Sequence, residues 1–233
     1  MALAHSPRIV TDGLVLHLDA ANTKSYIGSG TSWVDISGKG NNGTLVGGTG
    51  YSSDNGGCLI FDGTDDKVTM SAGSDFAYGT GDFTVEIWFN VTGTTPQTWG
   101  EVLYAQTIGG TNYFKVNSAR GNPPSKYPTF TYGTGGGTAV VSSTAYTEGT
   151  WHHYVVTRNG TALTVYLDNS SVATATVSHN FTNTSYVPTI GGYTHTNSNN
   201  FDGKISIVRV YKGKGFSSSD VTQNYNAMKW RYG

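Results

Sequence analysis

Hydrophobic and polar residues alternate along much of the chain with the period of a β-strand. The clearest segment runs from Phe83 to Asn90 and reads Phe-Thr-Val-Glu-Ile-Trp-Phe-Asn. Successive side chains of a strand lie on opposite faces. One face of this segment is therefore apolar, and the other carries Glu86 beside Trp88. The pattern predicts a sheet strand with a core face and a second face that holds a single carboxylate.

Similar short segments, separated by Gly, Asn and Asp, recur from one end of the chain to the other and predict an all-β sandwich or barrel. The turn Asn159-Gly160 fits a type I′ hairpin, and Asp168-Asn169 is expected to form the next reversal. The expected strands are Leu14–Asp19, Cys58–Asp62, Lys67–Met70, Phe83–Asn90, Glu101–Ala105, Tyr113–Val116, Tyr127–Tyr132, Thr138–Ser142, Trp151–Arg158, Leu163–Asp168, Val172–Ser178, Val187–Ile190 and Lys204–Tyr211.

One segment, Ser218–Met228, has the periodicity of a helix. Ser217 followed three residues later by Asp220 resembles a capping box, with Asp in place of the usual Glu. A helix this short needs packing to persist, so we expect it to dock on the sandwich. The apolar stripe expected to face the sandwich consists of Val221, Tyr225 and Met228.

The composition indicates one globular domain. Charged residues make up 12% of the 233 residues, about half of the usual share of roughly 25%. Although 32 residues are Gly, the 15 Tyr, 9 Phe and 5 Trp supply enough apolar area to argue against disorder. No break in composition divides the chain. We therefore expect an N-terminal arm over residues 1–12 and a single domain over residues 13–233.

The charge balance excludes several partners. A net charge of −1 and a pI near 6.6 provide no basic field for nucleic acid or anionic lipid. No segment approaches the ~20 apolar residues of a membrane span, so membrane insertion is not expected. The first residues also lack the apolar run of a signal peptide. The single cysteine, Cys58, precludes an internal disulfide and is expected to be a buried apolar residue.

Catalysis by paired carboxylates is not favoured. Glycosidases use two acids ~5 Å apart when retaining and ~6.5–9.5 Å apart when inverting, a spacing that positions i and i+2 of a strand satisfy. Around Glu86 those positions carry Thr84 and Trp88, and nothing in the sequence brings Glu101 or Glu148 to them. A glycoside hydrolase is therefore the least favoured function.

Other catalytic patterns are also missing from the sequence. It contains no Gly-x-Ser-x-Gly nucleophile elbow. His152 and His153 are adjacent, so on a strand they face opposite ways and cannot share a metal, and the remaining histidines lack ligand spacing. Catalytic residues are accordingly not assigned.

Asp65 and Asp66, close to Asp62 between two expected strands, are the candidate metal ligands, and calcium is the candidate ion. Carboxylates in loops suit a hard cation. The alternative is that Asp62-Gly63 forms a turn in which the carboxylate accepts backbone N–H groups.

Aromatic residues near Gly, Ser and Asn have the composition of adaptable binding loops, in which rings stack on sugars and amides bind hydroxyl groups. The alternative is that these rings cover sheet edges or form a subunit interface. The candidate carbohydrate-binding residues are Trp33, Trp88, Trp99, Tyr127 and Tyr193.

Taken together, several segments resemble the concanavalin A-like lectin/glucanase superfamily in its laminin-G-like jelly-roll branch. The resemblance implies two stacked antiparallel sheets. Glucanases of this superfamily carry Glu-x-Asp-x-x-Glu on one strand, but laid on Glu86 that pattern meets Trp88 and Val91. The resemblance also implies calcium ligation only at Asp65 and Asp66. The segments are Gly13–Ala20, Trp33–Gly43, Leu59–Asp66, Phe83–Asn90, Trp151–Thr157, Tyr166–Asp168, Phe201–Gly203, Val208–Tyr211 and Phe216–Tyr225.

The order of these segments also resembles virion proteins of tailed bacteriophages. That resemblance implies a non-catalytic structural or adhesive module of the virion, either a capsid decoration or a fibre component. Its expected partners are phage capsid or tail proteins and further copies of itself, with weak binding to cell-surface glycans as an added role. The alternative is a free carbohydrate-binding, lectin-like protein.

Overall fold

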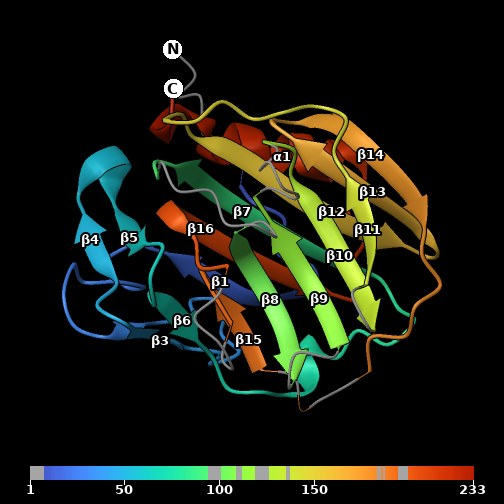
Figure 1. The fold of residues 1–233 in the computed structure, drawn as a ribbon, viewed down its shortest axis with the longest axis horizontal. Coiled ribbons are helices and arrows are strands. Elements are labelled where there is room, and N and C mark those ends of the chain that lie inside the picture. Colours follow the sequence, from blue (N-terminus) through green and yellow to red (C-terminus); the bar gives the residue numbers. More distant parts are fainter. Residues whose placement is uncertain are drawn as a thin grey trace.

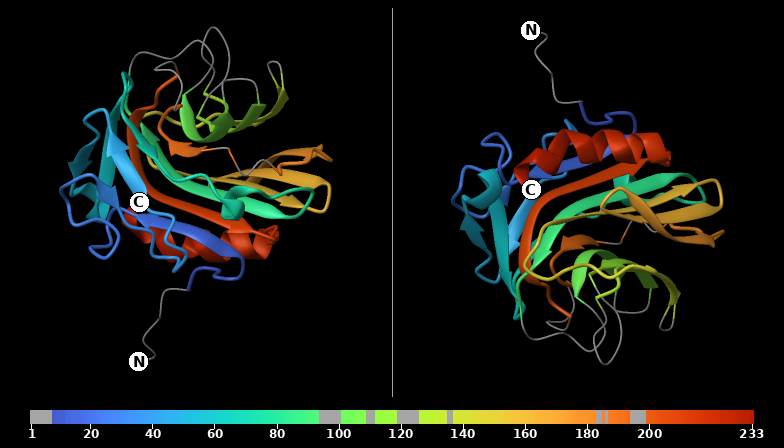
Figure 2. Two further views of the ribbon diagram at one scale, coloured as in Figure 1. Left: turned by 90° about the horizontal axis from the view of Figure 1, so that it is seen from below. Right: turned by 90° about the horizontal axis from the view of Figure 1, so that it is seen from above.

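The computed structural model describes residues 8–93, 101–108, 112–118, 126–134, 137–182, 185, 187–193 and 199–233 (Figure 1). Two antiparallel sheets of eight strands each stack face to face. Helix α1 (Ser218–Met228) lies on the outer face of one of them, which we call the helix-covered sheet (Figure 2). The predicted all-β, two-sheet sandwich with one short C-terminal helix, consistent with a jelly roll, is confirmed.

The helix-covered sheet has the strand order β14-β13-β12-β7-β16-β5-β4, and β1 also pairs with β16. The long strand β16 pairs with β1 along one part of its length and with β5 along another. The bounds are β14 (Ser170–Thr176), β13 (Ala162–Leu167), β12 (His152–Asn159), β7 (Phe83–Val91), β16 (Asp202–Lys212), β5 (Cys58–Asp62), β4 (Gly50–Ser52) and β1 (Leu14–Asp19).

The second sheet has the order β11-β10-β9-β8-β15-β6-β3-β2. Its central strands lie in front of the helix-covered sheet in Figure 1. The bounds are β11 (Thr138–Val141), β10 (Thr129–Thr134), β9 (Asn112–Asn117), β8 (Val102–Ile108), β15 (Val187–Ile190), β6 (Lys67–Thr69), β3 (Gly43–Val46) and β2 (Ser32–Trp33). Three short 3-10 turns complete the described elements: η1 (Asp54–Gly56), η2 (Ser74–Phe76) and η3 (Lys229–Arg231).

Every predicted strand coincides with an observed one, with ends that differ by a few residues. The sequence pattern missed β2, β3 and β4, which are short. The two hairpin turns differ from expectation in one respect. Asp168 and Asn169 both have positive φ and form the predicted reversal, whereas at the other hairpin Gly160 has a positive φ of 61° and Asn159 remains in β12. A positive φ at the first central residue alone fits a type II′ turn, so the type I′ prediction was wrong.

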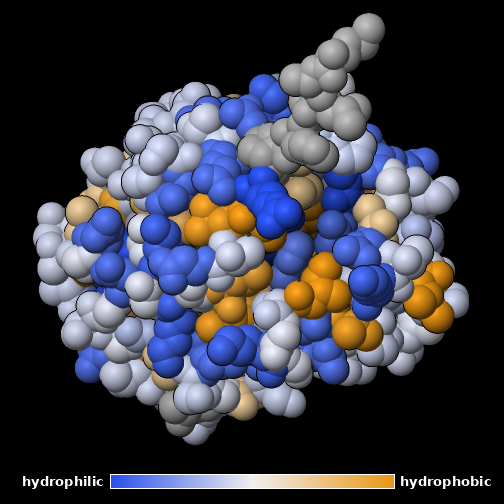
Figure 3. All heavy atoms as spheres, turned by 180° about the vertical axis from the view of Figure 1, so that it is seen from behind, coloured by the Kyte–Doolittle hydropathy of each residue, from blue (hydrophilic) through white to orange (hydrophobic). Residues whose placement is uncertain are grey.

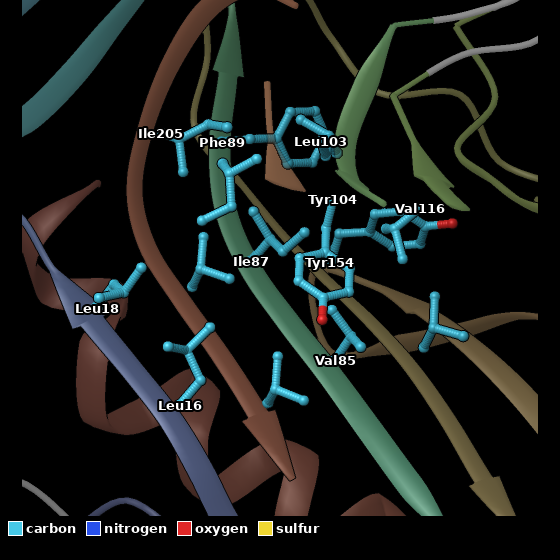
Figure 4. Close-up of a cluster of buried hydrophobic side chains, with 14 of the residues drawn as sticks. Leu16, Leu18, Val85, Ile87, Phe89, Leu103, Tyr104, Val116, Tyr154 and Ile205 are labelled. Carbon is cyan, nitrogen blue, oxygen red and sulfur yellow. The ribbon is translucent and has the colours of Figure 1, made fainter. Parts of the chain in front are cut away.

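The main hydrophobic core fills the space between the sheets. The apolar face of β7 supplies Val85, Ile87 and Phe89, all fully buried, as the alternation predicts. Leu103, Tyr104 and neighbouring side chains of the second sheet meet them from the other side (Figure 4). Phe83, Phe114, Phe130 and Phe181 add a cluster of mostly edge-to-face rings, an arrangement that aromatic side chains prefer.

A second, smaller core lies between the helix-covered sheet and α1. Residues 8–12 form no helix or strand, and Val10 from this segment packs there with Tyr211, Phe216 and Val221. The predicted capping box is present: Ser217 Oγ accepts from Asp220 N, and Asp220 accepts from Ser217 N. Among the described helices, none is long and apolar enough to cross a membrane.

The face of α1 that docks differs from the predicted stripe. The buried helix residues are Val221, Asn224 and Ala227, while Tyr225 and Met228 are half-buried. The helix is therefore rotated relative to its apolar stripe and presents Asn224 to the sheet. The reason is that Asn224 hydrogen-bonds to Glu86, a polar residue on the sheet beneath the helix.

Candidate functional site

Strand register brings Glu86 of β7 against a buried arginine. Arg209 of β16 lies directly opposite Glu86 on one side, and Val155 of β12 lies opposite on the other. His153 precedes Val155 by two residues, so it points to the same face of the sheet. Because α1 covers this face, Glu86, Arg209 and His153 are all completely buried.

The Glu86 carboxylate accepts three hydrogen bonds from buried side chains. Its Oε1 accepts from Arg209 Nη1 at 3.0 Å and from His153 Nε2 at 3.0 Å. Its Oε2 accepts from Asn224 Nδ2 of α1 at 2.7 Å, and Asn224 also donates to the Tyr211 hydroxyl. Burial by itself raises the pKa of Glu86, but the Arg209 charge and the hydrogen bonds outweigh it and lower the pKa to about 2.

This environment cannot serve acid–base catalysis. A general acid needs a pKa near the working pH and contact with the substrate, whereas Glu86 stays ionised and lies beneath the helix. Glu101 instead accepts from Ser118, which directly follows β9, and Glu148 pairs with Lys126 at the surface. Neither carboxylate joins Glu86.

The structure separates the predicted aromatic residues. Trp33 is completely buried in the inter-sheet core, and Trp88 is buried beneath α1, stacked on Tyr232 with ring centroids 4.3 Å apart. Neither ring is accessible to a sugar. Tyr193 is buried against Val102 and Ala105 on the second sheet. Tyr127, next to β10, is 39% exposed, and Trp99 lies outside the described residues.

The Asp62–Asp66 loop has a donor set suited to a hard cation. Asp62, Asp65 and Asp66 each place a carboxylate oxygen within 4.8 Å of the others. Asp66 is 4% exposed; its Oδ2 accepts from Asp62 N, while Oδ1 has no partner among the described residues. Burial, followed by the neighbouring carboxylates, raises the pKa of Asp66 to about 6. A cation would offset both the crowding and the missing partner.

The same loop also contains the turn that the sequence offered as the alternative. Asp62 Oδ1 accepts from Thr64 N at 2.8 Å, which is an Asx turn. Asn200, which is completely buried, donates to the Thr64 carbonyl, and its own Oδ1 has no partner within the described ranges. The turn therefore holds the loop in shape and leaves two buried oxygens beside it.

A surface groove of about 650 Å³ lies where the end of α1 meets the turns after β1 and β4. In Figure 2 the C-terminal end of the chain lies beside these blue and cyan segments. Sequence patterns did not identify this groove, because its residues come from three distant segments. The lining residues are Asp19, Ala21, Asn22, Thr23, Asn55, Gly56, Met228, Trp230 and Arg231.

The face that carries α1 is not a broad apolar docking surface. Figure 3 shows that the hydrophobic residues described on this face form separate islands between hydrophilic ones. Apolar residues scattered in this way are normal on a protein surface. Recognition on this face would therefore depend on local features.

A laminin G family model, described as "Concanavalin A-like lectin/glucanases superfamily", matches residues 62–221, which is more than half of the chain. The chain therefore belongs to the concanavalin A-like lectin/glucanase superfamily. The resemblance inferred from the sequence is thus confirmed at the level of the superfamily. Among curated proteins, none matches the sequence.

Solved structures share the fold at low identity. Domain 4 of AbnA, a GH43 extracellular arabinanase from Geobacillus stearothermophilus solved with arabinotriose, has a TM-score of 0.71 and 16% identity over 91% of this chain and 98% of that domain. The binding domain of botulinum neurotoxin DC, solved with SialylT, has a TM-score of 0.68 and 13% identity over 94% of this chain and 52% of that one. A mutant of Trypanosoma rangeli sialidase that displays trans-sialidase activity has a TM-score of 0.70 and 15% identity over 97% of this chain and 34% of that one.

These likenesses establish the fold alone. The chain spans about half the length of the toxin binding domains and about a third of the sialidases. It matches the AbnA domain over nearly its whole length.

Removing the charge of Glu86 should destabilise the protein strongly. Glu86→Gln leaves the Arg209 charge buried without a counter-ion, and breaking a buried pair in this way costs about 3–5 kcal/mol in the free energy of unfolding. Glu148→Gln breaks an exposed pair whose side chains are 45–50% accessible, so it should cost less than about 1 kcal/mol. Denaturant unfolding of both variants measures the difference. A loss below about 1 kcal/mol for Glu86→Gln would contradict a structural ion pair.

Calcium should stabilise the protein through Asp66. A ligand present at ~100 times its dissociation constant adds about 2.7 kcal/mol, which corresponds to a rise in melting temperature of about 2–4 °C per kcal/mol for a chain of this size. We expect millimolar calcium to raise the melting temperature of the chelator-treated protein and to leave that of Asp66→Asn unchanged. Asp54→Asn, which alters an exposed acid outside the loop, should keep the response. Equal melting temperatures with calcium and with chelator would refute the cation site.

Proposed function

We propose that this protein is a non-catalytic binding module that recognises glycans. The observation that carries the proposal is the state of Glu86. The strand on which the sequence resemblance lays the glucanase acids, β7, holds one carboxylate on this face, which is ionised, buried and bound to Arg209, His153 and Asn224. Because the only carboxylate on this face of β7 forms a buried ion pair, the face is suited to stabilising the fold and not to cleaving a bond. A protein with this fold is then suited to binding.

Structures of the same fold support this reading. Domain 4 of AbnA was solved with arabinotriose, and a botulinum neurotoxin binding domain was solved with SialylT. The match covers 98% of the AbnA domain, so a domain of about this size and fold was solved with a bound sugar. Because the AbnA domain belongs to an arabinanase and another match is a sialidase, hydrolysis is the reaction that an activity assay must exclude.

A glycan array probed with the purified protein tests the proposal. We expect binding to a subset of the glycans, with dissociation constants of about 0.1 to 1 mM for single units, about −4 to −5.5 kcal/mol. The same glycans should be recovered uncleaved after prolonged incubation. Cleavage that disappears in Glu86→Gln would overturn the non-catalytic assignment, and an array without any binding would overturn glycan recognition.

We further propose that the module is mounted on a tailed-phage particle as a capsid decoration or fibre component. The support is the order of sequence motifs, the low share of charged residues and the single buried cysteine, Cys58, which requires no oxidising compartment. Partners would then be capsid or tail proteins and further copies of this chain.

Mass spectrometry of purified particles from a strain that encodes the gene tests this placement. We expect the protein to copurify with particles through a density gradient, at a fixed ratio to the major capsid protein. Deleting residues 1–7, which leaves Val10 and its contacts beneath α1 in place, should lower that ratio, because a chain terminus becomes ordered when it docks on a partner. Protein found only in the free fraction would refute the virion placement and favour a free lectin-like protein.

A further inference from the structure

The groove at the end of α1 has the features of a ligand site that none of the sequence motifs marks. Trp230 lines this groove and is 68% exposed. Its Nε1 donates to the Ala227 carbonyl at 2.9 Å, so the one polar atom of the ring is already satisfied. The accessible part of the indole is therefore its apolar surface, held in a fixed orientation. A fixed, exposed ring of this kind is suited to stacking on an apolar ligand face.

The charges in the groove neutralise each other. Arg231 Nη1 donates to both carboxylate oxygens of Asp19 at 3.1 Å, and Nη2 donates to Ser206 Oγ at 2.9 Å. The two side chains are 7% and 11% exposed. Because the guanidinium is already engaged by Asp19, it is not available to an anionic ligand. The groove thus favours a ligand without net charge.

The turn η1 fixes the far wall. Asn55 Nδ2 donates to the Arg231 carbonyl at 2.8 Å, and its Oδ1 accepts from Trp151 Nε1 at 2.9 Å. Asn55 has a φ of 53°, in the left-handed region, and the hydrogen bonds of its side chain offset the cost of that conformation. The wall therefore keeps its shape without a ligand, which reduces the entropy lost on binding.

Hydrogen-bonding groups remain on the rim. Asn22 Oδ1 accepts from Lys24 N, which orients the amide. Within the described part of the chain, Asn22 Nδ2 and the hydroxyl of the exposed Thr23 make no hydrogen bond. An apolar ring and a few polar groups that line one groove are the usual composition of a small-ligand site, and a volume of about 650 Å³ lies within its usual range.

From these contacts we propose that this groove is a subsite for an uncharged sugar ring. The ring stacks on Trp230, and its hydroxyl groups bind Asn22 and Thr23. This inference rests on the proposed glycan-binding function and adds the location and the neutral charge class of the sugar.

Titration of ¹⁵N-labelled protein with methyl glycosides of glucose, galactose, arabinose and N-acetylglucosamine, followed by NMR, tests the site. We expect shifts in the backbone signals of residues 19–23, 54–56 and 228–231. Trp230→Ala should weaken binding about tenfold or more, as expected for a central aromatic contact, and Asn22→Ala about threefold or more. Val141→Ala, which alters an exposed apolar residue on the second sheet, should leave the dissociation constant unchanged.

The outcomes separate the two proposals. A glycoside that binds the wild type and Trp230→Ala equally would overturn the groove and leave glycan binding intact, as would a loss produced by Tyr127→Ala instead. Binding confined to sialylated or sulfated glycans would overturn the neutral charge class. The absence of binding to every glycoside and to the array would overturn both proposals. The melting temperature of each variant verifies that it is folded.

Discussion

The buried ion pair between Glu86 and Arg209 is the interaction on which the rest of this structure depends. Moving a carboxylate and a guanidinium out of water costs several kcal/mol for each ion, and only close pairing and further hydrogen bonds offset that cost. His153 and Asn224 supply those bonds. Since Asn224 comes from α1, the helix is required to complete the burial. The outer face of the helix-covered sheet is thereby closed, and a surface that would otherwise be open to ligands becomes interior.

Asn224 also explains how the ends of the chain are held. Besides bonding Glu86 and Tyr211, it accepts from Val10 N, so one amide joins the N-terminal segment, the helix and the sheet. The helix continues into η3, where Arg231 pairs with Asp19 and Trp230 reaches the surface. The groove thus lies at the end of the helix that Asn224 anchors over Glu86. The position of α1 therefore both buries Glu86 and leaves Trp230 accessible at the surface.

Much of the fold could be predicted from the alternation of residues, because strands such as β7 and β16 bury one face and repeat with a period of two. The helix and its Ser217–Asp220 cap were equally visible. The roles of individual side chains could not be predicted in this way. Trp33 and Trp88 resemble binding residues in composition, but long-range packing buries them, and the helix docks through Asn224, a polar residue that a hydrophobic pattern assigns to solvent. The groove was invisible because it joins residues far apart in the chain.

The protonation state of Glu86 tests the central claim most directly. A ¹³C NMR titration of the side-chain carboxyl, assigned by comparison with Glu86→Gln, reports that state in the folded protein. With its pKa lowered to about 2, Glu86 should show no titration between pH ~7 and pH ~3.5, where an exposed Glu titrates near ~4.3. A midpoint at or above that ordinary value would contradict a structural ion pair and would return Glu86 to the set of candidate catalytic acids.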